Sequence, residues 1–146
     1  MEKSKKFLQL CKKYKVDPAN LPNEVLSFED ACKITGDNPK KLPLVTGIAE
    51  RHRKRIIADY KLSIIAEAIK NNVPVDYTNG KYKHFPVFYV NADKKRPSGF
   101  GLAYYGADLW HSHSVVGVRL CFPNPDMAIF FGKHFIDLHK DHHLYT

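Results

Sequence analysis

The sequence predicts a single α+β domain, in which helices and strands occupy separate stretches of the chain. Helical spacing of apolar residues dominates residues 3–71, strand patterning with turn signals follows residue 74, and helical spacing returns after residue 124. Because helices and strands do not alternate, an antiparallel sheet is expected rather than a doubly wound parallel one. A length of 146 residues with 44% hydrophobic residues fits one domain over residues 1–146.

Two short helices are predicted in the N-terminal part. Residues 3–15 form an amphipathic pattern rich in lysine, which Asp17-Pro18 ends. The second helix begins at Ser27, whose side chain can accept a hydrogen bond from the amide three residues on, and it ends at Gly36. An alternative for residues 1–26 is a loosely attached helix and linker.

The longest helical pattern runs from about Gly47 to Asn71 and predicts a central helix. After residue 56 its apolar residues cover more of the helix surface than the single stripe of a surface helix. We therefore expect this helix to be packed on more than one side.

Aromatic and β-branched residues dominate the next part of the chain and predict strands. The first strand is expected at residues 84–90, and a turn follows at residues 94–99. Further strands are expected around Phe100 to Tyr105, around Asp108 to Ser112, and at Val115 to Phe122. These make a three- or four-stranded antiparallel meander. Asn124 is a natural cap and Pro125 suits a first helical position, so a final helix is expected to pack on the sheet.

Membrane insertion and secretion are not expected. No apolar run reaches the roughly 18 residues that a membrane-spanning helix needs, and no signal peptide is recognised at the start of the chain. The cysteines Cys11, Cys32 and Cys121 are odd in number and lie among apolar residues, which indicates reduced thiols in the core. The cytoplasm of a host cell is the expected location, with a virion as the alternative.

A formal net charge of +8 favours polyanionic partners, although solubility alone would also explain it. Arg51, Arg53 and Arg55 lie at the start of the central helix, where the helix dipole disfavours cations. A bound phosphate would compensate for this cost. The alternative is a solvated basic run, with Asp59 as a partner of Arg55 at the i,i+4 spacing.

A second basic cluster, Lys94-Lys95-Arg96, falls at the predicted turn and is followed by the aromatic residues Tyr104 and Trp110. Basic groups beside flat rings are typical of sites for single-stranded nucleic acid or a nucleobase. A charged hairpin tip above half-buried aromatic residues would show the same sequence pattern.

Four histidines are candidates for a zinc or manganese site. His111 and His113 share one face of a predicted strand, and His139 and His143 share one face of the final helix. If they converged, the protein would be a metal-dependent hydrolase. The alternative is a histidine-rich C-terminus that suits the negative end of the helix dipole. No catalytic motif is present, so no catalytic residue is predicted.

Several stretches resemble an uncharacterised family of small proteins from phages, prophages and mobile elements of gut bacteria. These stretches are Ser27–Cys32, Ile56–Leu62, Pro97–Gly101, Val116–Phe122 and Gly132–Phe135. The resemblance implies a genomic setting but no mechanism.

The first hypothesis is therefore a non-catalytic protein, encoded by a phage or mobile element, that binds an anionic ligand. The ligand would be nucleic acid, or a nucleotide signal sequestered as counter-defence. The metal-dependent hydrolase is one alternative, and a virion protein or an accessory protein that contacts a host or phage partner is another. The sequence gives no prediction of the oligomeric state.

Overall fold

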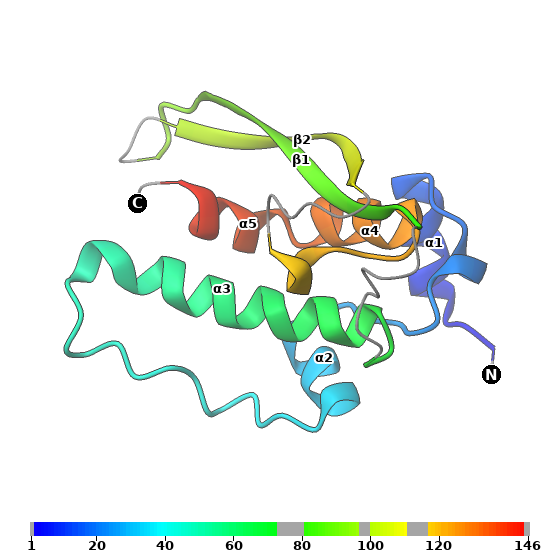
Figure 1. Cartoon of the computed structure of the whole chain (residues 1–146), viewed down its shortest axis with the longest axis horizontal. Coiled ribbons are helices and arrows are strands. Elements are labelled where there is room, and N and C mark those ends of the chain that lie inside the picture. Colours follow the sequence, from blue (N-terminus) through cyan, green and yellow to red (C-terminus); the bar gives the residue numbers. More distant parts are fainter. Residues whose placement is uncertain (1, 73–80, 97–99, 111–116, 145–146) are drawn as a thin grey trace.

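The computed structural model describes residues 2–72, 81–96, 100–110 and 117–144, and it confirms an α+β fold. The helices and strands are α1 (Lys5–Tyr14), the 3-10 helix η1 (Pro18–Asn20), α2 (Phe28–Thr35), α3 (Glu50–Ile69), β1 (Lys83–Ala92), β2 (Phe100–Trp110), the 3-10 helix η2 (Val118–Leu120), α4 (Pro125–His134) and α5 (Ile136–His143). They form layers, with the β1–β2 hairpin over α4 and α5, and with α3 and α2 on the other side of α5 (Figure 1).

Side-chain caps begin α1 and α2. The Ser4 side chain accepts a hydrogen bond from the Phe7 amide at 3.2 Å, and the Ser27 side chain accepts one from the Asp30 amide at 3.1 Å. Gly36 ends α2 with a left-handed φ of 85°, which glycine adopts without steric cost. The predicted start and end of the second helix are therefore confirmed.

Residues 2–26 contribute to the hydrophobic core. Phe7, Cys11, Leu21 and Val25 are almost completely buried. The Phe7 ring lies 5.6 Å from the ring of Phe130 in α4. The N-terminal helix is thus held by the burial of its apolar face.

The predicted central helix is α3, and it is packed on more than one side, as its sequence predicts. It contacts α2, α4 and α5, and its buried residues include Leu62, Ile64 and Ile65. The helix begins at Glu50, after Ala49, a residue with no side chain that can cap the first amides. It is followed by Asn71 and Asn72, which both have left-handed backbone conformations.

The sheet differs from the predicted meander of three or four strands. Within the described residues, β2 is the only strand that pairs with β1, in antiparallel register, and the break expected between Tyr105 and Asp108 does not occur. The register shifts between Val87 and Phe88, because a β-bulge gives β2 one extra residue there. The pairing resumes after the bulge, and β2 continues to Trp110.

The expected last strand, Val115 to Phe122, is not a strand where the structure describes it. Gly117 has a left-handed φ of 87°, and the Leu120 amide donates to the Gly117 carbonyl at 3.2 Å, which closes η2. Only Phe122 bridges to the sheet, through two hydrogen bonds with His84. The turn at Gly117 thus takes the place of strand pairing.

The C-terminal helices pack on the sheet, as predicted. The Asn124 side chain accepts a hydrogen bond from the Met127 amide at 2.9 Å, and Pro125 takes the first helical position of α4. The single expected helix is divided at Phe135, whose backbone conformation is not helical (ψ 30°). Gly132 lies against Pro86 and Tyr104, and its lack of a side chain allows this close approach.

The three cysteines are buried and not in disulfides, which confirms the prediction of reduced core thiols. Burial raises the pKa of Cys11 and Cys32, which keeps both thiols protonated at neutral pH. Among the helices of the described ranges, none has the length and apolar composition needed to cross a bilayer.

Candidate ligand-binding pocket

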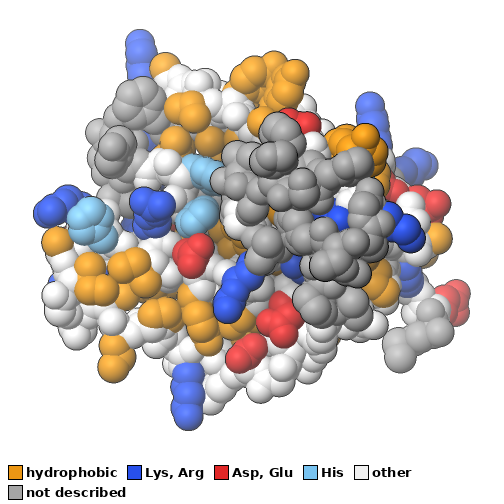
Figure 2. All heavy atoms as spheres, in the orientation of Figure 1, with side chains coloured by type: hydrophobic (Ala, Val, Ile, Leu, Met, Phe, Trp, Pro, Cys, Tyr) orange, Lys and Arg blue, Asp and Glu red, His pale blue; other side chains and the backbone are white. Residues whose placement is uncertain are grey.

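A pocket of about 410 Å³ lies where α3, α5, β1, η2 and α4 meet, and we call it the α3–α5 pocket. Its walls are formed by Arg55, Asp59, Pro86, Phe88, Leu120, Phe131, His139, His142 and His143. Histidine, basic and acidic side chains gather on the surface over α3 and α5 (Figure 2). The pocket therefore combines an apolar floor with several groups that bind charge or donate and accept hydrogen bonds.

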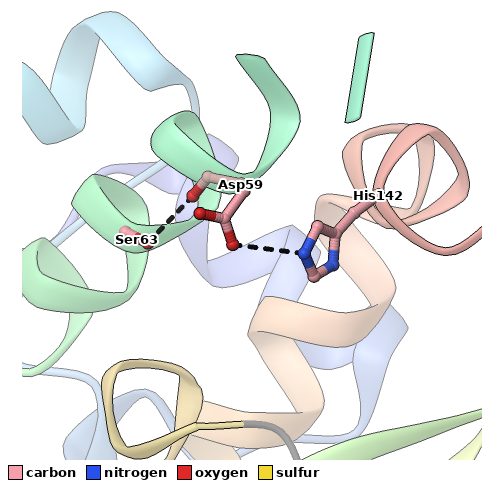
Figure 3. A network of polar contacts seen from close by, with 3 residues as sticks. All are labelled: Asp59, Ser63 and His142. Atoms are coloured by element: carbon pink, nitrogen blue, oxygen red, sulfur yellow. Dashed lines mark hydrogen bonds and ion pairs between the residues drawn. The ribbon is translucent and has the colours of Figure 1, made fainter. Parts of the chain in front are cut away.

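A hydrogen bond joins the two helices at the pocket. Nε2 of His142 in α5 lies 3.2 Å from a carboxylate oxygen of Asp59 in α3 (Figure 3). A carboxylate only accepts hydrogen bonds, so Nε2 carries the proton. Asp59 is also the residue whose backbone carbonyl accepts a hydrogen bond from Ser63, at 2.8 Å.

The second ring nitrogen of His142, Nδ1, is buried and has no hydrogen-bond partner in the described part of the chain. Burial is the main reason why the pKa of His142 is lowered; Arg55 lowers it too, while Asp59 acts in the opposite direction. The ring is therefore neutral at pH 7, and Nδ1 presents a lone pair.

His139 shows the same pattern in a more buried position. Its side chain is 1% exposed, and Nε2 lies 3.2 Å from the carbonyl oxygen of Phe131, which requires Nε2 to donate. Burial, followed by the neighbouring His143, lowers the pKa of His139 to about 3. Its Nδ1 is also buried and carries a lone pair, and no described residue donates a hydrogen bond to it.

Aromatic contacts fix the orientation of these imidazoles. The Phe88 ring of β1 lies 4.7 Å from the ring of His139 and 5.6 Å from the ring of His143. The Phe131 ring of α4 meets His139 edge-on at 4.6 Å. Packing from two other elements thus positions α5 at the pocket.

Arg55 lies in the pocket wall without its predicted partner. Asp59, at the i,i+4 position, pairs with His142 instead, and across the described residues Arg55 has no hydrogen bond or ion pair. Its charge acts on the pocket, because it lowers the pKa of both His142 and His143. An anion that entered the pocket would find a guanidinium group not yet neutralised by the protein.

The three arginines predicted to bind an anion together are not brought together. Arg53 donates from Nε to the carbonyl of Ile48 at 2.7 Å, and from a terminal guanidinium nitrogen to the carbonyl of Thr46 at 3.0 Å. It therefore holds the segment before α3 in place. Arg51 is exposed one helical turn before Arg55, so these two share a face of α3 that Arg53 does not.

The second basic cluster lies at the tip of the hairpin, at the same end of the molecule as the start of α3 and the end of α5 (Figure 1). Lys94 and Lys95 are exposed, and Arg96 is half-buried. Tyr104 faces the helices, where its ring contacts Phe88 and the ammonium group of Lys133. Tyr104 is therefore not an open surface for stacking, and the side chain of Trp110 lies outside the described residues.

The predicted metal site is not assembled in the part of the chain that the structure describes. His111 and His113 lie outside that part. The rings of His139 and His143 stack at 6.2 Å, but no three His, Cys, Asp or Glu side chains of the described residues are arranged to hold a metal ion. The metal-dependent hydrolase stays a prediction.

The chain matches no protein-family model, and neither the curated proteins nor the solved structures include a significant match. The resemblance to a phage and mobile-element family therefore also stays a prediction.

Proposed function

We propose that this protein binds a small anionic ligand, a nucleotide, in the α3–α5 pocket and does not transform it. The observation that carries the proposal is the unpaired guanidinium group of Arg55 in the wall of a pocket that the imidazoles of His139 and His142 also line. A volume of about 410 Å³ suits such a ligand, because small-molecule pockets have volumes of roughly 300–1,000 Å³.

The anionic end of the ligand would bind Arg55. A guanidinium group donates two parallel hydrogen bonds to a phosphate, a geometry that a lysine ammonium group cannot provide. Arg51, on the same face of α3, adds positive potential along the path to the pocket. Phosphate binding would also offset the cost of placing cations at the positive end of the helix dipole.

The opposite end of the ligand would supply hydrogen-bond donors. Nδ1 of His139 and Nδ1 of His142 each carry a lone pair at neutral pH and accept no hydrogen bond from the described residues. Leaving a buried acceptor without a donor costs about 1–3 kcal/mol of folding free energy. The amino and imino groups of a nucleobase, or a water molecule that the ligand holds in place, would satisfy them. The apolar wall of Pro86, Phe88 and Leu120 suits the face of a flat base.

The setting of this function rests on the family resemblance. In a phage or mobile element, a protein that sequesters a nucleotide would remove a signal used in host defence. A virion protein, or an accessory protein that contacts a host or phage partner, stays the alternative. This alternative predicts that the protein does not bind nucleotides.

The proposal is tested by thermal-shift measurements on protein dialysed against EDTA, so that a bound metal ion cannot carry the signal. AMP, GMP, CMP and UMP are added separately, with inorganic phosphate as the anion alone. At least one nucleotide is expected to raise the melting temperature in a concentration-dependent way. If nucleotides bind only after zinc or manganese is added, that result would instead favour the metal-dependent hydrolase.

Two variants locate the site. Arg55→Gln is expected to weaken nucleotide binding at least about tenfold, because hydrogen bonds to charged groups contribute about 1.5–3 kcal/mol. Lys54→Gln removes the same charge from the position directly before Arg55 in α3, and Lys54 does not line the pocket. This control variant should change nucleotide affinity less than about threefold. Equal losses in both variants, or no stabilisation of the unmodified protein by any nucleotide, would contradict the proposal.

A further inference from the structure

The solvent side of the β1–β2 hairpin carries two exposed tyrosines. Tyr89 is 57% exposed and Tyr105 is 61% exposed, and their ring centroids lie 4.6 Å apart in an edge-to-face arrangement. We call this side, with Val87, Ala103 and Gly106, the outer hairpin face. The opposite side carries Phe88 and Tyr104, which pack on the helices and the α3–α5 pocket.

The strand register explains why the tyrosine rings remain open to solvent. Tyr89 pairs with Ala103, and Val87 pairs with Gly106, so small residues lie opposite both positions of β1. Tyr105 falls at the bulge, between the residues that pair with Val87 and Phe88. Two rings that support each other over a floor of small side chains leave faces on which other flat rings can stack.

Positive charge lies at the tip of the same hairpin. Lys94 and Lys95 are exposed, and neither forms an ion pair with any residue that the structure describes. The nearest acid in the sequence, Asp93, accepts a hydrogen bond from the Lys95 amide at 3.0 Å, which commits its carboxylate to the turn. Exposed aromatic rings on a hairpin whose tip carries unpaired cations match a ligand that has both flat rings and regularly spaced negative charges.

We propose that the outer hairpin face binds single-stranded nucleic acid. Bases would stack on Tyr89 and Tyr105, while phosphates of the same strand would contact Lys94 and Lys95. A duplex would fit less well, because its bases are already stacked on each other and are not free to contact the rings. This site lies on the opposite side of the hairpin from the α3–α5 pocket, and it does not depend on the nucleotide proposed to bind there.

The test is fluorescence anisotropy with a labelled oligothymidylate of about 15 nucleotides, within the range of single-strand sites. We expect Tyr89→Ser combined with Tyr105→Ser to weaken binding at least about tenfold, since the stacking of two bases on two aromatic rings together contributes at least that much. Tyr89→Phe combined with Tyr105→Phe keeps both rings and should restore affinity to within about threefold. Both tyrosines are exposed, so the variants should melt like the unmodified protein.

A charge-matched pair of variants separates the hairpin from general basicity. Lys94→Gln with Lys95→Gln should weaken binding and reduce the slope of log affinity against log salt by about 1.4, which is about 0.7 for each lost phosphate contact of a single strand. Lys5→Gln with Lys12→Gln removes the same charge from the exposed surface of α1 and should leave the slope and affinity almost unchanged. Arg55→Gln should not affect this binding, which keeps the outcome distinct from that of the pocket.

The proposal is overturned if the serine variant binds the oligonucleotide as tightly as the unmodified protein, or if the α1 variant loses as much affinity as the hairpin variant. It is also overturned if a duplex of the same length binds as well as the single strand. A face that binds no nucleic acid would leave its tyrosines for contact with a protein partner, which is a different function.

Discussion

His139 is a residue at which burial has a large effect on protonation. Its ring is held by Phe88, Phe131 and a hydrogen bond to the Phe131 carbonyl, and it is 1% exposed. The folded protein therefore keeps this ring neutral, and burial also lowers the pKa of His142 and His143. In the neutral rings of His139 and His142, Nδ1 carries a lone pair for which the described residues supply no donor.

Stability should depend on pH through this histidine. Its pKa is about 3 in the folded protein and about 6.5 in the unfolded chain, so the unfolded state binds more protons between these values. The contribution is fully present above about pH 6.5 and is lost as the pH falls toward 3. By pH 5 the free energy of unfolding should decrease by about 2 kcal/mol from His139 alone.

Urea unfolding at pH 7.5 and at pH 5 measures this decrease. His142 and His143 add to it in the same direction, because their pKa values are also lowered. In His139→Phe, which keeps a flat ring but cannot bind a proton, the decrease should be smaller by about 2 kcal/mol. A decrease of the same size in that variant would show that His139 is not the responsible group.

At the scale of the elements, local signals in the sequence predicted the helices but not the sheet. Ser27 and Asn124 cap helices where their side chains are expected to do so, because capping depends on residues only a few positions apart. The number of strands depends on pairing with distant parts of the chain, and the turn at Gly117 replaces an expected strand.

The same distinction applies to the site. Arg55 was predicted as an anion-binding residue from its place at the start of a helix, and it lies in the pocket wall. Asp59 was considered as its partner because the i,i+4 spacing is visible in the sequence. The contact of Asp59 with His142 is tertiary, since it requires α5 to pack beside α3, and no local pattern indicates it.

The packing of α4 against the sheet depends on the absence of a side chain at residue 132. A Cβ atom there would lie 2.7 Å from the Pro86 side chain and 3.0 Å from the Tyr104 ring. We expect Gly132→Ala to destabilise the protein by about 1–2 kcal/mol, since overpacking outweighs the helix propensity gained. Chemical denaturation measures the change, and Gly47→Ala, which meets no atom within 4 Å, is the control. Unchanged stability in Gly132→Ala would mean that α4 and the hairpin are not packed this closely.

At the scale of the whole molecule, the layers create two distinct surfaces. The α3–α5 pocket lies between the hairpin and the helices, whereas the outer hairpin face is turned away from them (Figure 1). The start of α3, the end of α5 and the hairpin tip lie at one end of the chain's long axis, where several basic residues are exposed. An approaching polyanion would thus be attracted to this end of the molecule.

The most direct measurement is an NMR titration that observes the histidine ring nitrogens, using whichever of the four nucleotides stabilises the protein most. We expect His139 and His142 to carry their protons on Nε2 at neutral pH. Their Nδ1 resonances and the side-chain Nε–H resonance of Arg55 should shift as the nucleotide is added, while the side chain of Lys54 should show little change. Protons found on Nδ1, or nucleotide-induced shifts confined to residues away from the pocket, would contradict the proposed binding site.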